Sequence, residues 1–354
     1  MSDRPPTSLG DADSYASTDR VIQATYELEP LEWAEELGRI ESTGLAQGPD
    51  AIRARVVTTD GNRVVLAFPN RHLGHDVTLL VSALVAGEWA DSSVIRRCRL
   101  VRVDWPSGLP GPAFEPPDRV LVGAIVKPSL GLSPAEFAST AAALAHGGAD
   151  LIKDDELLGD DDWCPLEERV RATVAAIPSS TRYAANVSGR IDGLLQRAER
   201  AVELGASALM LNVFAQGLDA LRVLREQEFG VPIFAHRVGA AYWCRGERAS
   251  VASDVVAELT RLCGADFVQV GSFSGTVYDS AEQVKAQIEA CHRRLGPAHR
   301  SVAVLGGGVG PANAAEHLVK AGCNQAVMLL LGSAAYTHPG GVEEGVRATL
   351  AAIR

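Results

Sequence analysis

Short apolar runs alternate with amphipathic stretches from about residue 119 to the end of the chain. This rhythm predicts parallel strands that are each followed by a helix. The expected strands are Leu121–Val126, Leu151–Asp154, Tyr183–Val187, Ala208–Val213, Pro232–His236, Phe267–Gly271, Val302–Leu305 and Ala326–Leu331. The helices expected between them include Pro134–His146, Ile191–Leu204, Val251–Cys263 and Ala281–Arg294. Eight such units in a row predict an α/β fold, a (β/α)₈ barrel.

The amino-terminal part of the chain follows another pattern. The expected elements are strands at Arg53–Thr58, Arg63–Phe68 and Cys98–Asp104 and helices at Leu31–Ile40 and Val77–Ala86. The turn Asp60-Gly61 between two of these strands is typical of a hairpin. A Pro- and Gly-rich segment, Pro106–Pro117, ends the region. The sequence therefore predicts a disordered tail over residues 1–20, a small α+β domain over 21–117 and a barrel domain over 118–354.

Composition limits the possible partners. The chain has 354 residues and a net charge of -11, which argues against nucleic acid and anionic membrane surfaces as partners. No apolar stretch is long enough for a transmembrane helix, and the first 20 residues lack the pattern of a secretory signal. The six cysteines form no CxxC pair, which is typical of reduced thiols in a cytoplasmic protein. An anionic substrate would need a local positive site.

One lysine and three carboxylates directly follow a strand expected to be buried, in the run Lys153-Asp154-Asp155-Glu156. Side chains alternate along a strand, so Lys153 and Asp155 are expected on one side and Asp154 on the other. Glu156 can bend back toward Lys153. Two interpretations are open: an ion-paired cluster, or a hard-metal site in which Lys153 has taken up carbon dioxide as a carbamate. In the second, Lys153, Asp155 and Glu156 would give Mg²⁺ the oxygen ligands that it prefers.

Several polar residues and glycines fall at the carboxyl ends of the expected strands, where barrel enzymes carry their chemistry. They are Lys127, Lys153–Glu156, Asn186, Asn212, His236–Arg237, Gly271–Ser272, Gly306–Gly308 and Gly332–Ser333. Loops after the seventh and eighth strands commonly bind phosphate through free N–H groups. Gly307, Gly308, Gly332 and Ser333 are therefore candidates for phosphate binding. Asn186 is a candidate for substrate binding. Both Asn186 and Asn212 would either orient the metal or the substrate, or make an ordinary hydrogen bond at a strand end.

Three motifs resemble the ribulose bisphosphate carboxylase (Rubisco) superfamily over roughly residues 20–345. They are Gly123–Ser133 with its Lys127-Pro128 pair, Lys153–Glu156, and Phe234-Ala-His236-Arg237. The resemblance implies an Mg²⁺ ion bound by Asp155, Glu156 and a carbamylated Lys153. It also implies that Lys127 moves protons, that His236 lies near the metal and that Arg237 contacts a substrate phosphate. A planar guanidinium suits that contact.

The chain departs from the carboxylases of this superfamily at several places. The loop Gly271–Asp279 contains no lysine, where the carboxylase has one that stabilises the carboxylated intermediate. Ser129 replaces a second lysine, and Gln269 replaces a phosphate-contacting histidine. A carboxylase asparagine near the metal corresponds to Glu88, which would act as a base or pair with Lys127. The turn Glu41–Gly44, with Thr43 as a candidate substrate contact, resembles a substrate-contacting turn, but Leu45-Ala46 replaces the threonine-tryptophan pair that should follow.

Because of these replacements, carbon dioxide fixation is not expected. The chain resembles the non-carboxylating, Rubisco-like branch of the superfamily. The favoured hypothesis is Mg²⁺-dependent enolisation or isomerisation of a phosphorylated ketose-like sugar, such as a methylthio-pentulose phosphate. Two alternatives remain: a decarboxylase or C–C hydrolase of a 3-oxo sugar-acid phosphate, and a non-catalytic binding or regulatory protein. The base could be Lys127, the Lys153 carbamate or Glu88. The resemblance also implies a homodimer or an assembly of dimers, with Thr43 and Glu88 serving the neighbouring subunit.

Overall fold

The computed structural model describes residues 21–45, 48–74, 76–85, 87–274, 277–295, 298–322 and 326–354. The predicted tail (1–20), Ala46 and Cys323 lie outside the described residues. The described part of the chain divides into two compact units. One contains the residues up to Leu109 and also Ala240–Val256, and the other contains Pro110–Gly239 and Ala257–Arg354.

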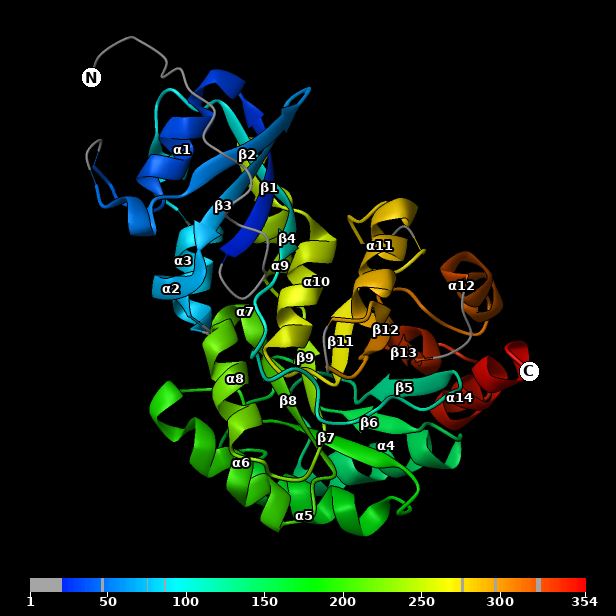
Figure 1. Cartoon of the computed structure of the whole chain (residues 1–354). Helices are drawn as coiled ribbons and strands as arrows, with labels where there is room; N and C mark the ends of the chain where they lie inside the picture. The colour runs from blue at the N-terminus through cyan, green and yellow to red at the C-terminus, as the bar shows by residue number, and fades with distance from the viewer. Residues whose placement is uncertain are drawn as a thin grey trace. The chain divides into compact units, whose positions relative to one another are not determined.

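The first unit is built on one sheet whose described strands lie in the order β10-β4-β1-β3-β2 (Figure 1). The strands are β1 (Val21–Glu29), β2 (Arg55–Asp60), β3 (Arg63–Pro69), β4 (Arg97–Asp104) and β10 (Ala249–Val251). The helical segments are η2 (Leu31–Trp33), α1 (Ala34–Ile40), η3 (Asp50–Ile52), α2 (Asn70–Leu73), α3 (Val77–Leu84), η4 (Glu88–Asp91) and α9 (Ala240–Cys244). The predicted hairpin is confirmed, since β2 and β3 pair antiparallel with Asp60 opposite Arg63.

Strand β10 corrects the sequence analysis at one place. The helix predicted over Val251–Cys263 begins only at Ser253, as α10 (Ser253–Leu262). Residues Ala249–Val251 instead pair in parallel with Cys98–Leu100 of β4. Residues 240–256, which the sequence analysis placed in the barrel domain, therefore pack with the amino-terminal unit. Pairing with a distant strand outweighed the local helical pattern, as tertiary context commonly does.

The second unit is a barrel, and in the described residues eight parallel strands close it in the order β11-β12-β13-β5-β6-β7-β8-β9. They are β5 (Leu121–Ile125), β6 (Leu151–Lys153), β7 (Arg182–Asn186), β8 (Ala208–Asn212), β9 (Ile233–His236), β11 (Phe267–Val270), β12 (Val302–Gly306) and β13 (Val327–Leu331). The α/β fold and the predicted barrel are confirmed. Each strand lies within two residues of its predicted bounds at either end.

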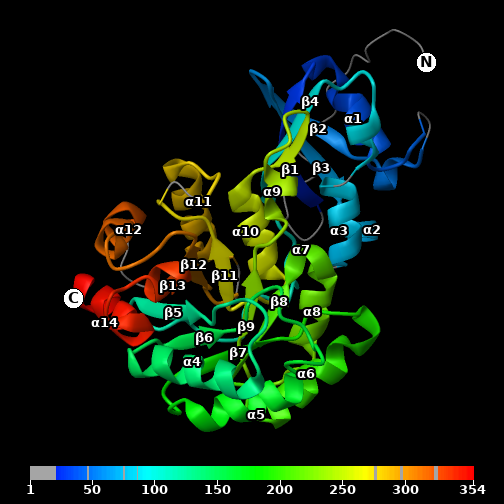
Figure 2. The same ribbon diagram turned by 180° about the vertical axis from the view of Figure 1, so that it is seen from behind.

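Helices surround these strands on the outside, and Figure 2 shows α4, α5 and α6 along the β5–β7 side of the barrel. The helices of this unit are α4 (Pro134–His146), α5 (Leu166–Ala176), η5 (Ile191–Gly193), α6 (Leu194–Glu203), α7 (Val213–Gln216), α8 (Leu218–Glu226), α11 (Ala281–His292), α12 (Ala314–Ala321), α13 (Ser333–Tyr336) and α14 (Gly341–Ala352). Helix α4 begins where it does because Ser133 and Glu136 form a capping box and Pro134 takes the first helical position.

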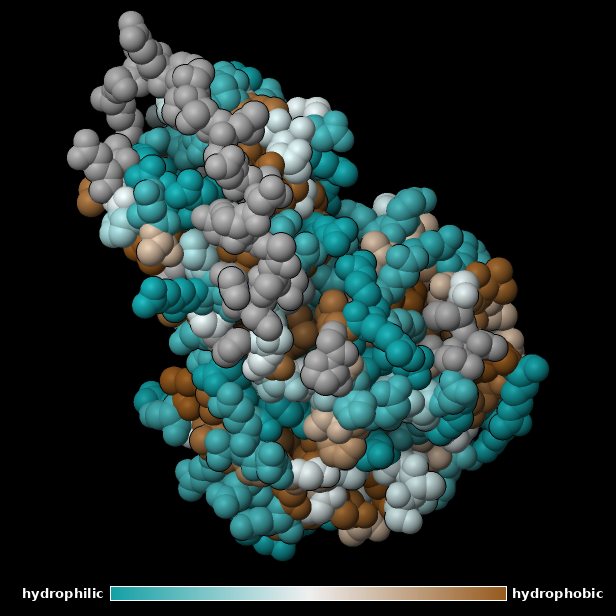
Figure 3. Space-filling model, viewed as in Figure 1, coloured by the Kyte–Doolittle hydropathy of each residue, from teal (hydrophilic) through white to brown (hydrophobic). Residues whose placement is uncertain are grey.

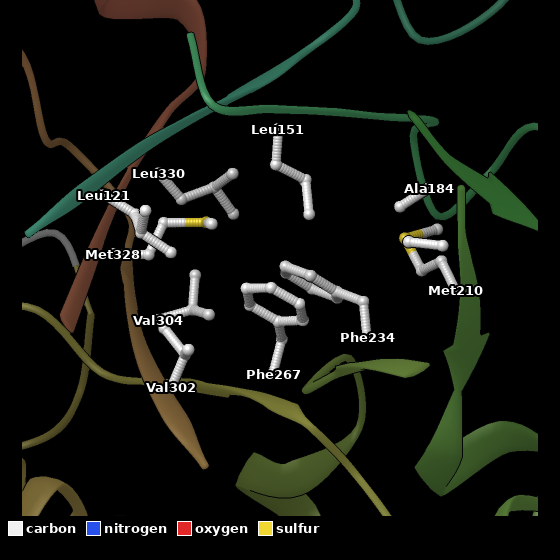
Figure 4. Packing of buried hydrophobic residues seen from close by; sticks show 11 residues of the cluster. Leu121, Leu151, Ala184, Met210, Phe234, Phe267, Val302, Val304, Met328 and Leu330 are labelled. Carbon is white, nitrogen blue, oxygen red and sulfur yellow. The ribbon is translucent and has the colours of Figure 1, made fainter. Parts of the chain in front are cut away.

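An apolar layer fills the barrel. It contains Leu121, Leu151, Ala184, Ala208, Met210, Phe234, Phe267, Val302, Val304, Met328 and Leu330. Figure 4 shows these side chains converging from all sides, with Phe234 and Phe267 stacked at a centroid distance of 6.1 Å. This layer makes the barrel a packed core and not a pore.

Hydrophilic residues cover most of the face seen in Figure 3, with hydrophobic residues in small separate groups. Among the described residues, no helix combines the length and the apolar character that crossing a bilayer requires. Cys98, Cys164, Cys263 and Cys291 are buried thiols, and burial raises the pKa of Cys98, Cys263 and Cys291.

Candidate active site

A polar layer lies directly above the apolar core, at the carboxyl ends of the strands. Successive side chains of a strand point to opposite faces, so the residue two positions after a core residue points inward again. Five strands place a polar side chain there, two positions after Leu151, Ala184, Met210, Phe234 and Phe267. These side chains are Lys153, Asn186, Asn212, His236 and Gln269. The alternation of side chains along the strands therefore places a polar layer directly on the apolar layer.

Lys153 is fully buried in this layer. Its Nζ donates to the main-chain carbonyl of Asp154 at 2.7 Å and lies 5.8 Å from the centre of the Phe234 ring. Within the described residues, no carboxylate forms an ion pair with it. Burial lowers the pKa of Lys153 to about 8, although Glu156 and Asp155 act in the opposite direction. About one tenth of the amine is therefore neutral at pH 7, far more than for a lysine in water.

Lys127 and Asp155 form the second part of the site. The Lys127 Nζ lies 2.6 Å from the Asp155 Oδ2 and 2.9 Å from the Ser129 hydroxyl. Burial alone would raise the pKa of Asp155, but the hydrogen bonds from Lys127 and from the Leu157 N–H lower it. The Tyr336 hydroxyl accepts the Lys127 N–H at 2.8 Å and donates to the Ile125 carbonyl at 3.0 Å. Tyr336 thus fixes the main chain that carries Lys127.

Glu156 faces His236 across the layer, with 3.4 Å between its Oε2 and the His236 Nε2. Burial and the nearby cations lower the pKa of His236 well below its usual value, so the ring is neutral. Its Nδ1 accepts the Val238 N–H at 3.3 Å, which assigns the hydrogen to Nε2, facing Glu156. Asn212 donates to the Glu156 carbonyl at 2.9 Å, and its buried Oδ1 has no partner among the described residues.

Asp154 points to the opposite side, as the alternation predicts, and anchors the loop. Its carboxylate receives the Tyr183 hydroxyl at 2.6 Å and the Asn186 N–H at 2.8 Å. It also pairs with Arg169 at 3.1 Å, and both side chains of this pair are 0% exposed. The Asn186 side chain donates to the Leu158 carbonyl at 3.0 Å. The main-chain turn after β6 is therefore held from below by a buried ion pair and by Asn186.

The donor set fits a hard cation if Lys153 is modified. Among the described residues, no group of three His, Cys, Asp or Glu side chains is placed to hold a metal ion. Asp155 and Glu156 alone supply two carboxylates, and a carbamate on Lys153 would add a third oxygen donor. The partnerless Oδ1 of Asn212 adds a further buried polar atom beside Glu156.

The glycine loop after β12 presents main-chain N–H groups. Gly307 and Gly308 adopt φ values of 110° and 69°, which favour glycine. Their carbonyls are engaged: the Ser272 and Ser274 hydroxyls donate to the Gly307 carbonyl, and Asn313 donates to that of Gly308 at 2.9 Å. Within the described residues, neither glycine N–H has a hydrogen-bond partner. Such free N–H groups suit an anion.

Gly332 and Ser333 lie at the end of the adjacent strand β13, where Gly332 is the N-cap residue of α13. Arg237 lies at the end of β9, where Asp279 and Tyr278 contact its guanidinium. The structure thus brings Lys127, Lys153, Asp155, Glu156 and His236 together. The substrate contacts predicted for Arg237 and for both glycine loops stay predictions.

Thr43 and Glu88 belong to the other compact unit, and their part in an active site also stays a prediction. The Thr43 hydroxyl donates to the Leu45 carbonyl at 2.9 Å, and Glu88 is exposed at the start of η4. In the same unit, Glu41 accepts the Trp89 N–H at 2.9 Å. Burial raises the pKa of Glu41 to about 7, and a Cβ at Gly87 would collide with its carboxylate.

Glu41→Gln is expected to stabilise the protein at pH 8 but not at pH 4.5. The folded state holds the Glu41 proton more tightly, so this group's contribution to stability is full below its unfolded pKa and is lost as pH rises through about 7. Thermal unfolding should give the variant a melting temperature about 3 °C higher at pH 8. Glu36→Gln on helix α1, which ends directly before Glu41, is the control, because the hydrogen bond from Arg39 lowers the pKa of Glu36. Glu36→Gln should lower the stability of the protein, and this loss should become smaller as pH falls. The same pH response in both variants would contradict a raised pKa for Glu41.

Four residues of this neighbourhood escaped the sequence analysis: Arg169, Tyr183, Asp279 and Tyr336. Each acts through a contact with a residue between 15 and 209 positions away. No local motif marks them. Of the four residues, Tyr183 had the most informative sequence position, because it is an aromatic residue at the start of a predicted strand.

The fold and the polar layer define a (β/α)₈ barrel whose carboxyl end carries an acid–base cluster. The family model of the ribulose bisphosphate carboxylase large chain, catalytic domain, matches residues 113–354. The chain therefore belongs to this family. Among its relatives, the ribulose bisphosphate carboxylase-like protein of Allochromatium vinosum is 32% identical over 286 residues, 75% of this chain and 61% of that protein.

A second relative covers more of the chain. The 2,3-diketo-5-methylthiopentyl-1-phosphate enolase of Geobacillus kaustophilus is 33% identical over 341 residues, 90% of this chain and 79% of that enzyme. Thus the chain matches about three fifths of the length of the first relative and more of the second.

Solved structures agree with the fold. The octameric Rubisco of Pyrococcus horikoshii OT3, solved with sulfate, superposes with a TM-score of 0.88 at 25% identity, over 97% of this chain and 89% of that one. The rubisco-like protein MtnW of Alicyclobacillus acidocaldarius gives 0.80 at 28% identity, over 94% and 93%. The predicted resemblance to the Rubisco-like branch is confirmed.

Proposed function

We propose that the chain is an Mg²⁺-dependent enolase-type enzyme. Its substrate would be a phosphorylated ketose-like compound of the methylthio-pentulose class, enolised without carbon dioxide fixation. The observation that carries the proposal is the Lys127–Asp155 pair at 2.6 Å beside the buried Lys153. The enolases of similar sequence and the absence of lysine from Gly271–Asp279 support it.

Lys153 would be converted to a carbamate before it binds the metal. The neutral amine adds carbon dioxide, an N–C bond forms and one proton leaves to solvent. Its fully buried position and its lack of an ion-pair partner among the described residues favour this reaction, since burial disfavours the charged ammonium. Asp155, Glu156 and the carbamate would then hold Mg²⁺, which when bound polarises a carbonyl and eases removal of the neighbouring proton.

Lys127 is the proposed base. Asp155, whose Oδ2 lies 2.6 Å from the Lys127 Nζ, would be a ligand of the cation, and Lys127 would lie beside the substrate. The free amine takes the proton alpha to the substrate carbonyl, the C–H electron pair forms the new C–C double bond, and the carbonyl π pair moves onto the oxygen to give the enolate. The Ser129 hydroxyl, 2.9 Å from the Lys127 Nζ, would keep the amine directed at the alpha proton of the substrate. The N–H groups of Gly307, Gly308, Gly332 and Ser333 would hold the phosphate.

His236 would position Glu156 by donating from Nε2, and its neutral ring adds no competing charge. Asn186 would act from beneath the loop, through its hydrogen bonds to the main chain, and not by touching substrate.

The direct test follows the alpha proton. The purified chain is given 2,3-diketo-5-methylthiopentyl 1-phosphate with Mg²⁺ and bicarbonate in D₂O, and exchange of the proton is followed by NMR. Exchange that depends on Mg²⁺ is the expected result. No exchange, combined with carbon dioxide release from a 3-oxo sugar-acid phosphate, would replace the proposal with the decarboxylase alternative.

Lys127→Met is expected to lower the exchange rate by about 10²–10⁴-fold, the usual contribution of a positioned base. The same NMR assay measures it. Lys320→Met is the matched control, because Lys320 pairs with Glu316 on the exposed face of α12 and should leave the rate unchanged. A loss below about tenfold would move the role of base to another residue.

We also propose that the active enzyme is a homodimer or an assembly of dimers in which Thr43 and Glu88 complete the neighbouring subunit's site. The octameric state of the P. horikoshii Rubisco supports an assembly of this kind. Mixing Lys127→Met and Glu88→Gln subunits tests it. Recovery of activity in the mixture is expected, and no recovery on exchange of subunits would contradict sharing.

A further inference from the structure

The positive charge of Arg237 is already compensated inside the protein. Its Nη2 lies 2.9 Å from the Asp279 Oδ2 and donates to the Tyr278 hydroxyl at 2.8 Å. The guanidinium also stacks over the Tyr278 ring, 5.2 Å from its centre. The Asp279 side chain is 0% exposed and the Arg237 side chain 14%. A carboxylate with no access to water screens this arginine at close range.

Asp279 is built into this position. The Gln287 side chain donates to its Oδ1 at 2.9 Å. Gly271, at the end of β11, leaves room for the carboxylate, since a Cβ there would lie 2.6 Å from the Asp279 Oδ2. Gln287 of α11 therefore holds the Asp279 carboxylate, and Gly271 leaves room for it. The ion pair is part of the folded site and not a chance surface contact.

Three buried polar atoms at this end make no hydrogen bond within the described residues: the Arg237 Nη1, the Asp279 Oδ2 and the Gln269 Oε1. The first two belong to an ion pair whose charges cancel, and Gln269, on the neighbouring strand β11, is uncharged. A phosphate dianion needs an excess of positive charge when it leaves water, whereas a hydroxyl or thioether group does not.

We infer that Asp279 is a specificity-determining residue, which sets the Arg237 end of the site to accept an uncharged group and to disfavour a second phosphate. The inference rests on the proposed function and narrows it to monophosphates. The single phosphate binds at the glycine loops, and a hydroxyl- or thioether-bearing tail takes the Arg237 end.

The test compares two ligands that differ only in this group. Isothermal titration calorimetry measures the dissociation constants of a 5-methylthiopentulose 1-phosphate and of the matching pentulose 1,5-bisphosphate, with Mg²⁺ and bicarbonate present. In the wild type, the bisphosphate is expected to bind no tighter than the monophosphate. Asp279→Asn keeps the volume and an acceptor for Gln287 but adds one net positive charge, so relative binding of the bisphosphate should improve by about tenfold.

Two further variants make the test independent of how well Asp279→Asn folds. Arg237→Gln removes one positive charge and should weaken relative bisphosphate binding by about tenfold, while Arg237→Gln/Asp279→Asn restores neutrality and should return the ratio to within about threefold of wild type. A purely structural role would not make the ratio follow net charge.

The results distinguish a failure of the inference on Asp279 from a failure of the proposed function. A wild type that turns over the monophosphate yet binds the bisphosphate more than about tenfold tighter overturns this inference alone. The same holds if the ratio is unmoved in all three variants. If the wild type binds neither ligand, this inference and the proposed function fail together.

Discussion

Lys153→Met is expected to remove Mg²⁺ binding and, with it, enolisation. The change deletes the amine that would become the third oxygen ligand and leaves only Asp155 and Glu156 as carboxylates. Affinity for Mg²⁺ should fall by about 100-fold or more, since losing even an outer partner of a metal site costs up to that amount. Calorimetric titration of Mg²⁺ in bicarbonate buffer measures the loss.

The fold should survive this substitution. Methionine has a similar length and removes a buried polar group that donates a single hydrogen bond. A thermal melt like that of the wild type is the control, and Lys127→Met should retain Mg²⁺ affinity because Lys127 is no ligand. Unchanged Mg²⁺ binding by Lys153→Met would rule out a carbamate at this position.

Arg169→Leu is expected to lower the free energy of unfolding by about 3–5 kcal/mol, the usual cost of breaking a buried ion pair. It leaves the Asp154 carboxylate at 0% exposure with Tyr183 and the Asn186 N–H as its remaining donors among the described residues. Urea denaturation measures the loss. Because Asp154 anchors the turn before Asp155 and Glu156, Mg²⁺ affinity should fall in the same variant.

The control is Arg200→Leu, which breaks an exposed pair with Glu167 and should cost less than about 1 kcal/mol. The double variant Arg169→Leu/Asp154→Asn removes both charges and should regain part of the loss. Equal effects of the two single arginine variants would show that the Asp154 ion pair does not hold the loop.

The polar layer could be predicted from the sequence because strand periodicity decides it. Once Leu151 and Phe234 are recognised as inward-facing, Lys153 and His236 must point inward two residues later. The order of barrel strands follows from the same pattern. Local alternation was sufficient to predict the barrel and to place Lys153 and His236 at the carboxyl ends of its strands.

The partners of those residues could not be predicted, because they come from the packing of distant segments. The Lys127 main chain is fixed by Tyr336, 209 positions away, and Arg237 is compensated by Asp279 from a loop after another strand. Val251 was predicted to begin a helix, yet Ala249–Val251 pair with β4. A motif therefore predicted that Arg237 contacts a phosphate, and only the packing shows how its charge is balanced.

The bicarbonate dependence of alpha-proton exchange tests most directly whether a metal site is built on Lys153. The rate of exchange into 2,3-diketo-5-methylthiopentyl 1-phosphate is measured in D₂O at fixed Mg²⁺, in buffer freed of carbon dioxide and then with bicarbonate restored. Exchange should fall to background without carbon dioxide and return when it is added, because Lys153 must become a carbamate first. An equal rate in both buffers would contradict a metal site built on Lys153.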